Sequence, residues 1–430
     1  MSLLRYPTYK DSGVAWLGEV PVHWEVKRIG YYFDERREKV SDKDFDALSV
    51  TKNGVVPQLE TAAKTDDGDN RKKVCKGDFV INSRSDRKGS SGASDLDGSV
   101  SLINTVLRPR DEIAINFAHH VLRSQPFQEE YYRFGKGIVA DLWSTNYSEM
   151  KNVSLAVPPV PEQQTIAAFL DRETGKIDAL VAEQQRLVEL LAEKRQAVIS
   201  HAVTKGLNPN VPMKDSGIEW LGEVPAHWGC MPMKYLVRLK SGGTPSKDQH
   251  DYWDGSIPWA SGKDMKVEIL SDTVDHITEL AIEQGAATLI EQGVVLVVVR
   301  GMILARTFPV ALTGERMAIN QDLKAVFAGT KLQSAFLAWY LRGTAEESLR
   351  RLDEAAHGTK ALRMEAWTSM EVALPPLDEQ VAIANFLGRT TSQLDTLTAE
   401  ANRAIALLQE RRSALISAAV TGKIDVRQAA

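Results

Sequence analysis

Two long segments of the chain place mostly apolar residues at alternating steps of three and four, the spacing of helices that pack side by side. The first segment has this seam at Ile177, Leu180, Gln184, Leu187, Leu191, Lys194, Val198 and His201. The second has it at Leu394, Leu397, Ala401, Ala404, Leu408, Arg411, Leu415 and Ala418. Each buried Leu, Ile or Val contributes about 1.5 to 3 kcal/mol. The pattern predicts two long coiled-coil helices, with an ordinary helical-bundle core as the alternative.

Two further regions, roughly residues 30–150 and 233–370, contain short β-branched runs bounded by Gly, Asp or Asn, which predict strands. These runs are GDFVINS, GSVSLINTVLR, GVVLVVVRGMIL and MAINQDLKAVF. Apolar residues at three and four spacing predict helices near the end of each region, over residues 117–134 and 334–352. The expected fold class is therefore α+β, with two mixed α/β domains separated by the two long helices.

The framing segments of these regions occur twice. DSGVAWLGEVPVHW at residues 11–24 returns as DSGIEWLGEVPAHW at 215–228, and PPVPEQQTIAAFL at 158–170 returns as PPLDEQVAIANFL at 375–387. Between the frames no similarity is visible. We therefore expect four segments: 1–157 with the repeat element 10–24, a helical spacer 158–206, 207–374 with the repeat element 214–228, and a helical spacer 375–430. The Trp and His residues of the short element are expected to form a packing joint.

An internal pseudo-twofold repeat would make the two long helices antiparallel. A helix from about Lys176 to Thr204 would be about 43 Å long at about 1.5 Å per residue. One turn of B-DNA is about 34–36 Å. The helices would then separate two DNA-binding domains by about one turn.

Composition excludes several classes of protein. The apolar run LIEQGVVLVVVRGMIL is interrupted by Glu291 and Arg300, so no membrane span is expected, and the N-terminus has no secretion pattern; we expect a cytoplasmic protein. Cys75 and Cys230 lack metal-site spacing. The net charge is -5, yet residues 71–88 hold seven Lys or Arg against two Asp. This local excess indicates a nucleic-acid contact or, equally on charge alone, a solvated basic face.

Candidate DNA-binding residues combine Lys and Arg with small or amide side chains in Gly-rich loops, because such loops offer donors to bases and let backbone approach phosphates. In the first region they are Lys52, Arg71, Lys72, Lys73, Asn82, Arg84, Arg87, Lys88, Ser90, Ser91 and Lys136. In the second they are Lys240, Gly242, Gly243, Thr244, Ser246, Lys247, Lys263, Arg300, Arg306, Asn320, Gln321 and Lys360.

Catalytic patterns are weak. KSGGTPSKD lacks the Gly-Lys-Ser/Thr of a phosphate loop, and no methyltransferase tetrapeptide is present. Asp78 with Asp86 and Lys88, or Asp254 with Asp264 and Lys266, imitates a magnesium nuclease. We expect no catalytic residue and no bound metal. A stand-alone nuclease and a coiled-coil scaffold remain the alternatives.

The duplicated DSGxxWLGEVPxHW and PPxxEQxxIAxFL elements around two unlike inserts strongly resemble the specificity subunit of type I restriction-modification enzymes, the HsdS family, over almost the whole chain. GDFVINSRSDRKGSSG, GTPSK with IPWASGKDM, and VVVRGMILARTFPVAL resemble target-recognition domains of that family. The resemblance implies that each domain recognises one half of an asymmetric bipartite site on double-stranded DNA. It also implies two methyltransferase subunits with S-adenosylmethionine, which modify adenine, and motor-nuclease subunits with ATP and magnesium. This chain would bind none of those cofactors directly.

Overall fold

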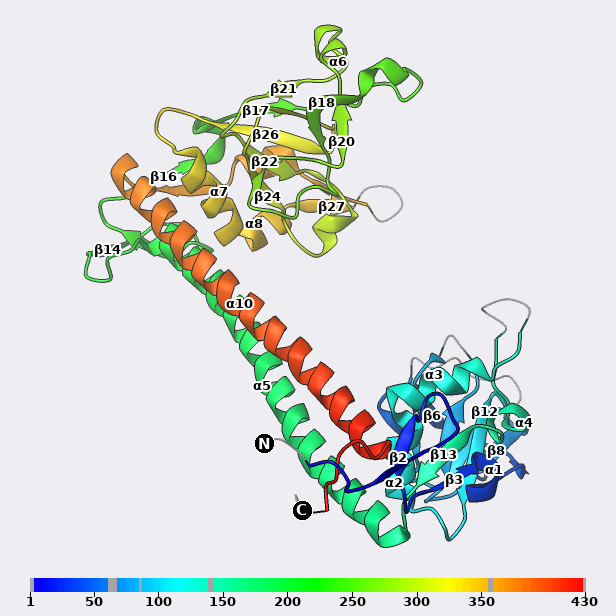
Figure 1. Ribbon diagram of the computed structural model, residues 1–430. Helices are drawn as coiled ribbons and strands as arrows, with labels where there is room; N and C mark the ends of the chain where they lie inside the picture. The colour runs from blue at the N-terminus through cyan, green and yellow to red at the C-terminus, as the bar shows by residue number, and fades with distance from the viewer. Residues whose placement is uncertain (1–3, 61–67, 85–86, 138–142, 355–358, 428–430) are drawn as a thin grey trace. The chain divides into compact units, whose positions relative to one another are not determined.

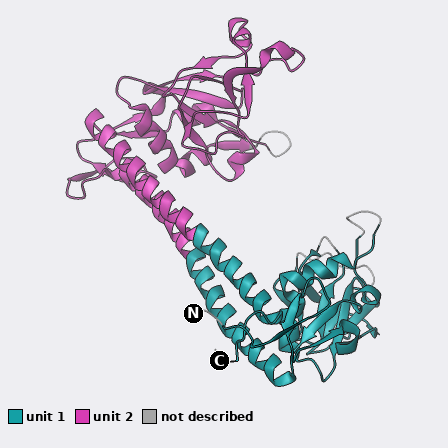
Figure 2. Cartoon of the chain, in the orientation of Figure 1, with its two compact units in different colours: residues 1–185, 402–430 teal, residues 186–401 magenta. Residues whose placement is uncertain are grey.

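The computed structural model describes residues 4–60, 68–84, 87–137, 143–354 and 359–427. The chain forms two compact units: unit 1 contains residues 1–185 and 402–430, and unit 2 contains residues 186–401 (Figure 2). The long helices α5 (Val160–Lys205) and α10 (Leu377–Val420) contribute residues to both units (Figure 1). In the described ranges no helix has the length and apolar character needed to cross a membrane. The α+β class with two long helices is confirmed, whereas the four segment boundaries stay a prediction.

The core of unit 1 is a four-stranded antiparallel sheet with two helices packed near it. Its strand order is β10 (Ser91–Ala93), β9 (Phe79–Asn82), β12 (Asn104–Pro109) and β4 (Phe33–Glu35). The helix α2 (Ile115–Arg123) contacts β9 and β10, and α3 (Gln125–Arg133) follows it. The single helix expected over 117–134 is divided at Ser124, whose hydroxyl accepts a bond from the Phe127 N–H and caps α3.

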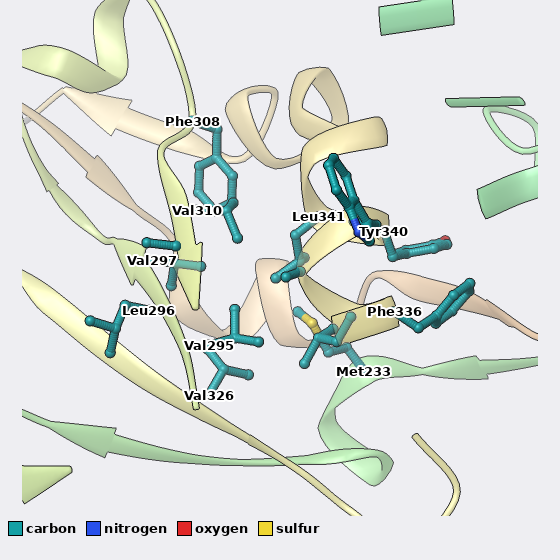
Figure 3. Close-up of a cluster of buried hydrophobic side chains, with 14 of the residues drawn as sticks. Met233, Val295, Leu296, Val297, Phe308, Val310, Val326, Phe336, Tyr340 and Leu341 are labelled. Atoms are coloured by element: carbon teal, nitrogen blue, oxygen red, sulfur yellow. The ribbon is translucent and has the colours of Figure 1, made fainter. Parts of the chain in front are cut away.

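Unit 2 has a larger sheet of five strands. Their order is β17 (Val237–Ser241), β26 (Leu323–Ala328), β22 (Val295–Val298), β24 (Val310–Thr313) and β19 (Ile269–Leu270). The helix α7 (Ser334–Gly343) packs on β22, β24 and β26. Figure 3 shows Val295 and Val297 of β22 in the same buried cluster as Tyr340 and Leu341 of α7. Burial of each such side chain stabilises the folded state by about 1.5 to 3 kcal/mol. The packing of α7 on the sheet therefore stabilises unit 2.

The remaining elements are short and complete the two units. Unit 2 has a second sheet in the order β20 (Asp275–Ile277), β18 (Trp253–Ala260), β25 (Met317–Ile319) and β21 (Leu289–Ile290). Unit 1 also contains α1 (Ile29–Tyr32), β3 (Glu25–Arg28), β5 (Lys39–Val40), β6 (Leu48–Thr51), β7 (Gly54–Pro57), β8 (Arg71–Val74), β11 (Gly98–Val100), α4 (Tyr147–Met150) and β13 (Ser154–Val157). Unit 2 also contains β16 (Gly229–Pro232), α6 (Glu279–Glu283), β23 (Arg300–Gly301), α8 (Ala345–Leu349), β27 (Leu352–Glu354), β28 (Lys360–Leu362), α9 (Met364–Thr368) and β29 (Glu371–Leu374).

The two inserts share a topology that their sequences do not reveal. β9 lies between β10 and β12 in unit 1, as β22 lies between β24 and β26 in unit 2. Gly77 and Gly293 precede these central strands at φ values of 90° and 79°, where glycine is favoured. Their N–H groups donate to the Ser94 and Thr313 carbonyls at 2.8 Å in both units. The two inserts, unlike in sequence, therefore share the strand order around β9 and β22.

The repeated Trp-His element is a packing joint at the start of each long helix, as expected. β1 (Tyr9–Asp11) pairs with β2 (Glu19–Pro21) in unit 1, and β14 (Met213–Asp215) pairs with β15 (Glu223–Pro225) in unit 2. Glu162, in the first turn of α5, accepts bonds from Trp24 Nε1 at 3.0 Å and His23 Nε2 at 2.8 Å. Glu379 of α10 holds Trp228 and His227 in the same way. The repeat therefore fixes each insert to its own helix.

A buried glutamine beside each of these glutamates ties the helix start to the insert. Gln163 is fully buried; its side-chain oxygen accepts from the Ala114 N–H at 2.7 Å, and its side-chain nitrogen donates to the carbonyls of Glu112 and Pro158. Gln380 makes the same three bonds in unit 2. Because an unpaired buried amide is costly, the Glu-Gln pair explains why this motif is kept in both copies.

The helix seam is half confirmed and half corrected. Ile177, Leu191 and Leu394 are buried as predicted, and Val198, Leu408 and Leu415 are half-buried. Leu180, Leu187 and Leu397, however, are 46%, 41% and 47% exposed. The intervening seam positions lie one residue later, at Val181, Val188, Arg195, Ala202, Thr398, Ile405, Arg412 and Ala419. On a helix, the residues three and four positions after a given residue both lie on its side. In these two helices the residue at the fourth position, and not the one at the third, faces the partner helix.

Two equivalent ion pairs show that α5 and α10 are antiparallel within each unit. In unit 1 Arg412 Nε donates to Asp178 Oδ1 at 2.8 Å. In unit 2 Arg195 Nε donates to Asp395 Oδ1 at 3.3 Å. An early residue of one helix thus meets a late residue of the other in both cases. Asp178 and Asp395, like Arg195 and Arg412, are equivalent positions of the sequence repeat.

Candidate nucleic-acid interface

Arg84 and Arg300 occupy equivalent, exposed positions just beyond the central strands β9 and β22. Arg84 is bridged to Ser144, and Arg300 pairs with Ala361, so each arginine lies beside the segment that returns toward the long helix. In both units the carbonyl before the arginine accepts a bond from that segment, at 3.0 and 2.8 Å. A rigid core strand therefore positions one arginine at the surface of each unit.

Other predicted residues of unit 1 gather near Arg84. Lys136 is bridged to the same Ser144, and its ammonium, on a side chain 79% exposed, lies 3.2 Å from Glu149. Arg87 and Lys88 are exposed, and the Lys88 ammonium lies 5.1 Å from the centre of the Tyr132 ring. These side chains form a basic surface on the loops beside β9.

A hollow of about 420 Å³ in unit 1 carries more positive charge than the sequence indicated. It is lined by Lys52, Lys88, Gly89, His119, His120, Arg123, Gln128, Arg412 and Ile416. Arg123 lies 2.8 Å from His119 Nε2 and donates to the Lys52 carbonyl, while His120 Nε2 lies 2.8 Å from Asp171. The hollow unites residues of α2, α3 and α10 with loops. The polar and charged contributors that sequence reasoning missed are His119, His120, Arg123, Gln128 and Arg412.

The electrostatics of this hollow favour an anion. Burial, together with the nearby Arg123 charge, lowers the pKa of His119 to about 4, so its ring is neutral at pH 7. Burial and the Arg412 charge lower the pKa of Arg123 as well. Both shifts mean that added positive charge is disfavoured there, and a bound anion would relieve that cost. A phosphate group has the charge and acceptors that these donors need.

Six predicted residues of unit 1 lie in its core or are held by it, which corrects their proposed role. Arg71 is 4% exposed and its guanidinium donates to Ser99 Oγ at 2.8 Å. Lys72 donates to the Asn104 carbonyl at 2.7 Å, and Lys73 pairs with Glu38 at 2.9 Å. Asn82, Ser90 and Ser91 are 8%, 7% and 1% exposed. Because strand β8 is paired on both sides, its basic run supports the sheet and does not form a free surface, and the side chains of Lys72 and Lys73 are only 17% and 24% exposed.

In unit 2 the Gly-rich loop after β17 meets the turn after β25. Gly243 N–H donates to the Ile319 carbonyl at 2.9 Å, and Thr244 donates its hydroxyl to the Gln321 side chain. A Cβ on Gly242 would lie 2.0 Å from the Ile319 carbonyl oxygen, so only glycine fits. Thr244 and Gln321 are exposed, whereas Asn320 is 7% exposed with its side-chain oxygen bonded to the Asp322 N–H. Asn320 therefore shapes the turn that presents Gln321.

The remaining predicted residues of unit 2 are spread over its loops. Lys240, Ser246, Lys247, Lys263, Arg300 and Arg306 are exposed, and Lys360 is half-buried. Lys263 pairs with Asp275 at 2.6 Å. Lys360 pairs in register with Gly301, so it lies on the strand next to Arg300. The structure therefore brings together one group around Thr244 and another around Arg300.

Two carboxylates of the nuclease pattern, Asp78 and Asp264, form hydrogen bonds within the fold. Asp78 is 2% exposed and accepts two bonds from Arg36, at 2.7 and 3.0 Å. Asp264 accepts from the Ser261 N–H at 2.9 Å and the Val274 N–H at 3.1 Å, which organises a loop. Asp86 lies outside the described residues. Among the residues that are described, no three His, Cys, Asp or Glu side chains are grouped to hold a metal ion.

Known proteins with similar sequences share one description. Residues 225–406 match the family model of the type I restriction modification DNA specificity domain. The specificity subunit of the Escherichia coli type I restriction enzyme EcoR124I/EcoR124II is 27% identical over 286 residues, and the match spans 65% of each chain. The putative type I restriction enzyme MjaX specificity subunit of Methanocaldococcus jannaschii is 21% identical over 457 residues and 99% of each chain.

Solved structures agree in fold. A chain from work on complex assembly and conformational transition of the type I restriction-modification system has a TM-score of 0.72 at 16% identity, covering 93% of this chain and 98% of that one. The HsdS subunit from Thermoanaerobacter tengcongensis has a TM-score of 0.56 at 18% identity, covering 94% and 98%. The duplicated frame, the paired long helices and these matches together make the chain similar to type I restriction-modification specificity subunits, in sequence to their family model over residues 225–406 and in fold over 93% of the chain.

Proposed function

We propose that this chain supplies the DNA sequence specificity of a type I restriction-modification complex, with unit 1 recognising one half of a bipartite site and unit 2 the other. The observation that carries the proposal is the duplicated scaffold with Arg84 and Arg300 at equivalent exposed positions. A guanidinium can donate two bonds to a guanine edge in the major groove. The two surroundings differ in sequence, so the two half-sites differ and the full site is asymmetric.

In unit 1 we assign phosphate contacts to the basic hollow and base contacts to the loop beside it. Lys52, Lys88 and Arg412 contribute positive charge around a hollow of about 420 Å³, which suits a backbone phosphate. Arg84 stands at the end of a buried strand, where a fixed position favours base recognition. Lys136 and Arg87 are exposed beside it and would add backbone contacts.

In unit 2 the group around Thr244 and the group around Arg300 would both contact DNA. Gln321 is exposed and is held by Thr244, and a held amide suits the two-bond contact to adenine. Lys240 and Lys247 flank the same loop and would contact phosphates. Lys360 lies on the strand beside Arg300 and supports that position.

Catalysis belongs to partner subunits in this proposal. Methyltransferase subunits would bring S-adenosylmethionine and extract the target adenine from the duplex, and motor-nuclease subunits would bring ATP and magnesium. Two methyltransferase subunits fit the repeat, because each unit exposes an equivalent pair of leucines, one on each long helix. Unit 1 exposes Leu180 and Leu407, at 46% and 58%, and the equivalent residues Leu397 and Leu190 of unit 2 are 47% and 44% exposed. Apolar residues that face solvent on both helices are a surface for protein partners.

The long helices would set the distance between the half-sites. Their packing is specified by seam residues and by the Asp178–Arg412 and Asp395–Arg195 pairs. Inserting one helical turn into both helices would therefore lengthen the unspecified gap of the DNA site and leave both half-sites unchanged.

The proposal is tested by selection from a randomised double-stranded DNA library with the chain assembled on a compatible methyltransferase subunit. We expect two short conserved blocks separated by a gap of fixed length. Enrichment of one contiguous block, or of no block by an assembled complex, would contradict the proposal. Magnesium-dependent cleavage by the chain alone would support the nuclease alternative.

A further inference from the structure

The two Trp-His joints differ in one respect that the repeat does not predict. Glu162 and Glu379 each accept bonds from a tryptophan and a histidine of the joint, over distances of 2.6 to 3.0 Å. The side chain of Glu162 is 9% exposed, whereas that of Glu379 is 38% exposed. The same carboxylate is therefore covered in unit 1 and open in unit 2.

Tyr6 is what covers Glu162. Its hydroxyl donates to Glu162 Oε1 at 2.8 Å, and its ring, only 3% exposed, meets the Trp24 ring edge-on with centroids 6.0 Å apart. Arg427 lies over the outer side of the ring, 4.9 Å from its centre. A tyrosine phenol thus completes the joint by adding a third donor to the carboxylate and by filling the space beside the tryptophan.

Unit 2 lacks this tyrosine because its chain path is different. In unit 1 the joint is covered by two segments, the N-terminal residues and the residues that follow α10, which are bridged between Leu4 and Asp425. In unit 2 one continuous connection from α5 to β14 takes their place. The residue aligned with Tyr6 is Asn210, followed by Val211, and neither side chain is a phenol.

The result is an open pocket of about 270 Å³ beside Glu379. It is lined by Lys205, Gly206, Leu207, Asn208, Val211, Pro225, His227, Glu379, Ala382 and Ile383. Its walls are apolar except for the carboxylate, the imidazole and the ends of Lys205 and Asn208. Such a pocket, with few polar groups that fix orientation, suits a ring that carries one hydroxyl.

The rim of this pocket points to a protein as the source of the ring. Leu207 is 41% exposed, and Leu377 and Val381, on either side of Glu379 in α10, are each 43% exposed. In unit 1 the position equivalent to Val381 is Gln164, a polar residue. Exposed apolar side chains around a pocket are typical of protein contacts, so the rim is suited to a polypeptide segment.

We propose that a tyrosine side chain of the partner methyltransferase subunit occupies this pocket and donates its hydroxyl to Glu379, as Tyr6 does to Glu162. The identity of the partner rests on the proposed function, whereas the chemistry of the pocket does not. The Tyr6 of a second copy of this chain is a poor source, because it is buried in unit 1 and bonded there. The proposal makes the two docking positions of the partner unequal, since only unit 2 has an open pocket.

The pocket chemistry is tested with p-cresol, which is the tyrosine side chain as a free molecule. Ile383 lines the pocket and Ile166 is its equivalent in unit 1, so their labelled methyl groups report on the two joints by NMR. We expect p-cresol to shift Ile383 and not Ile166 in the native chain, and to shift both in Tyr6→Ala. Toluene, which lacks the hydroxyl, should shift Ile383 at least fivefold less at equal concentration. An unshifted Ile383, or equal responses to p-cresol and toluene, would overturn the proposal.

The source of the ring is tested in the assembled complex. With the methyltransferase subunit bound, p-cresol should no longer shift Ile383, and Val211→Tyr, which fills the pocket from within, should weaken assembly about tenfold. Val22→Tyr, at a residue 45% exposed in unit 1, is the control and should leave assembly unchanged. An assembled complex in which Ile383 still responds to p-cresol would overturn this inference alone. Failure of the native chain to assemble would instead contradict the proposed function, so the two failures are distinguishable.

Discussion

Arg84 and Arg300 are equivalent residues of two duplicated scaffolds: each follows a fully buried central strand, and each lies beside the segment that leads back to a long helix. The loops around them have no sequence similarity, so the position is kept while its neighbours change. A shared backbone that presents one arginine in two different settings suits recognition of two different half-sites.

Replacement of either arginine should affect one half-site only. Arg84→Ala should relax or weaken recognition in the half bound by unit 1, and Arg300→Ala in the half bound by unit 2, each by about 1 to 3 kcal/mol if the guanidinium contacts a guanine. Binding to variant half-sites measures this directly. Arg186→Ala, which removes an exposed partner of Glu189 on α5, is the control. Equal losses in both halves from a single substitution would contradict the assignment.

The corrected helix seam predicts opposite outcomes for two leucines of α5. Leu191 is 8% exposed, so Leu191→Ala should lower the free energy of unfolding by about 2 to 4 kcal/mol. Leu180 is 46% exposed, and Leu180→Ala should cost under about 1 kcal/mol. Thermal unfolding of the two variants compares them. A larger loss from Leu180→Ala would restore the seam that the sequence indicated.

The unequal joints predict unequal effects of one substitution. Glu162→Ala leaves the buried Trp24 N–H and the Tyr6 hydroxyl without their acceptor, and should lower the free energy of unfolding by about 3 kcal/mol. Glu379→Ala removes a carboxylate that is 38% exposed and should cost about 1 kcal/mol. Scanning calorimetry separates the two. Similar losses from both variants would show that Tyr6 adds little to the joint.

The basic hollow predicts a pH dependence. The pKa of His119 is lowered to about 4 by burial, so its neutral form contributes stability that is complete above about pH 6.5 and is lost as the pH falls toward 4. His119→Gln should flatten that part of the stability curve. A phosphate bound in the hollow should raise the pKa of His119, which NMR titration with and without DNA measures. An unchanged pKa in the DNA complex would exclude this hollow from the interface.

The framing elements could be predicted from the sequence because they are duplicated with little change. The repeated sequence elements allowed us to predict the joint around Trp24 and the long helices. The heptad spacing identified Ile177 and Leu191 as seam residues. The prediction was wrong at the intervening positions because neighbouring residues such as Leu180 and Val181 are both apolar. Spacing alone does not tell which of the two faces the other helix. The register follows from Asp178 and Arg412, a pair 234 residues apart in sequence.

The interface was harder to predict because charge along the sequence does not show burial. Arg71 and Lys72 belong to the most basic run of the chain, yet strand pairing places their polar ends on Ser99 and on a backbone carbonyl. Arg412 and Arg123 are far apart in sequence and meet only because α10 packs beside α2, so no local pattern links them. The shared topology of the inserts was likewise hidden, since it is carried by backbone pairing and by the conformations of Gly77 and Gly293.

The most direct measurement is to co-express the chain with a compatible methyltransferase subunit and to map adenine methylation across the host genome by long-read sequencing. The account predicts one split motif: two short, different blocks around an unspecified gap of fixed length, with methylated adenines in both blocks. A continuous motif, or no new methylation although the complex assembles, would contradict it.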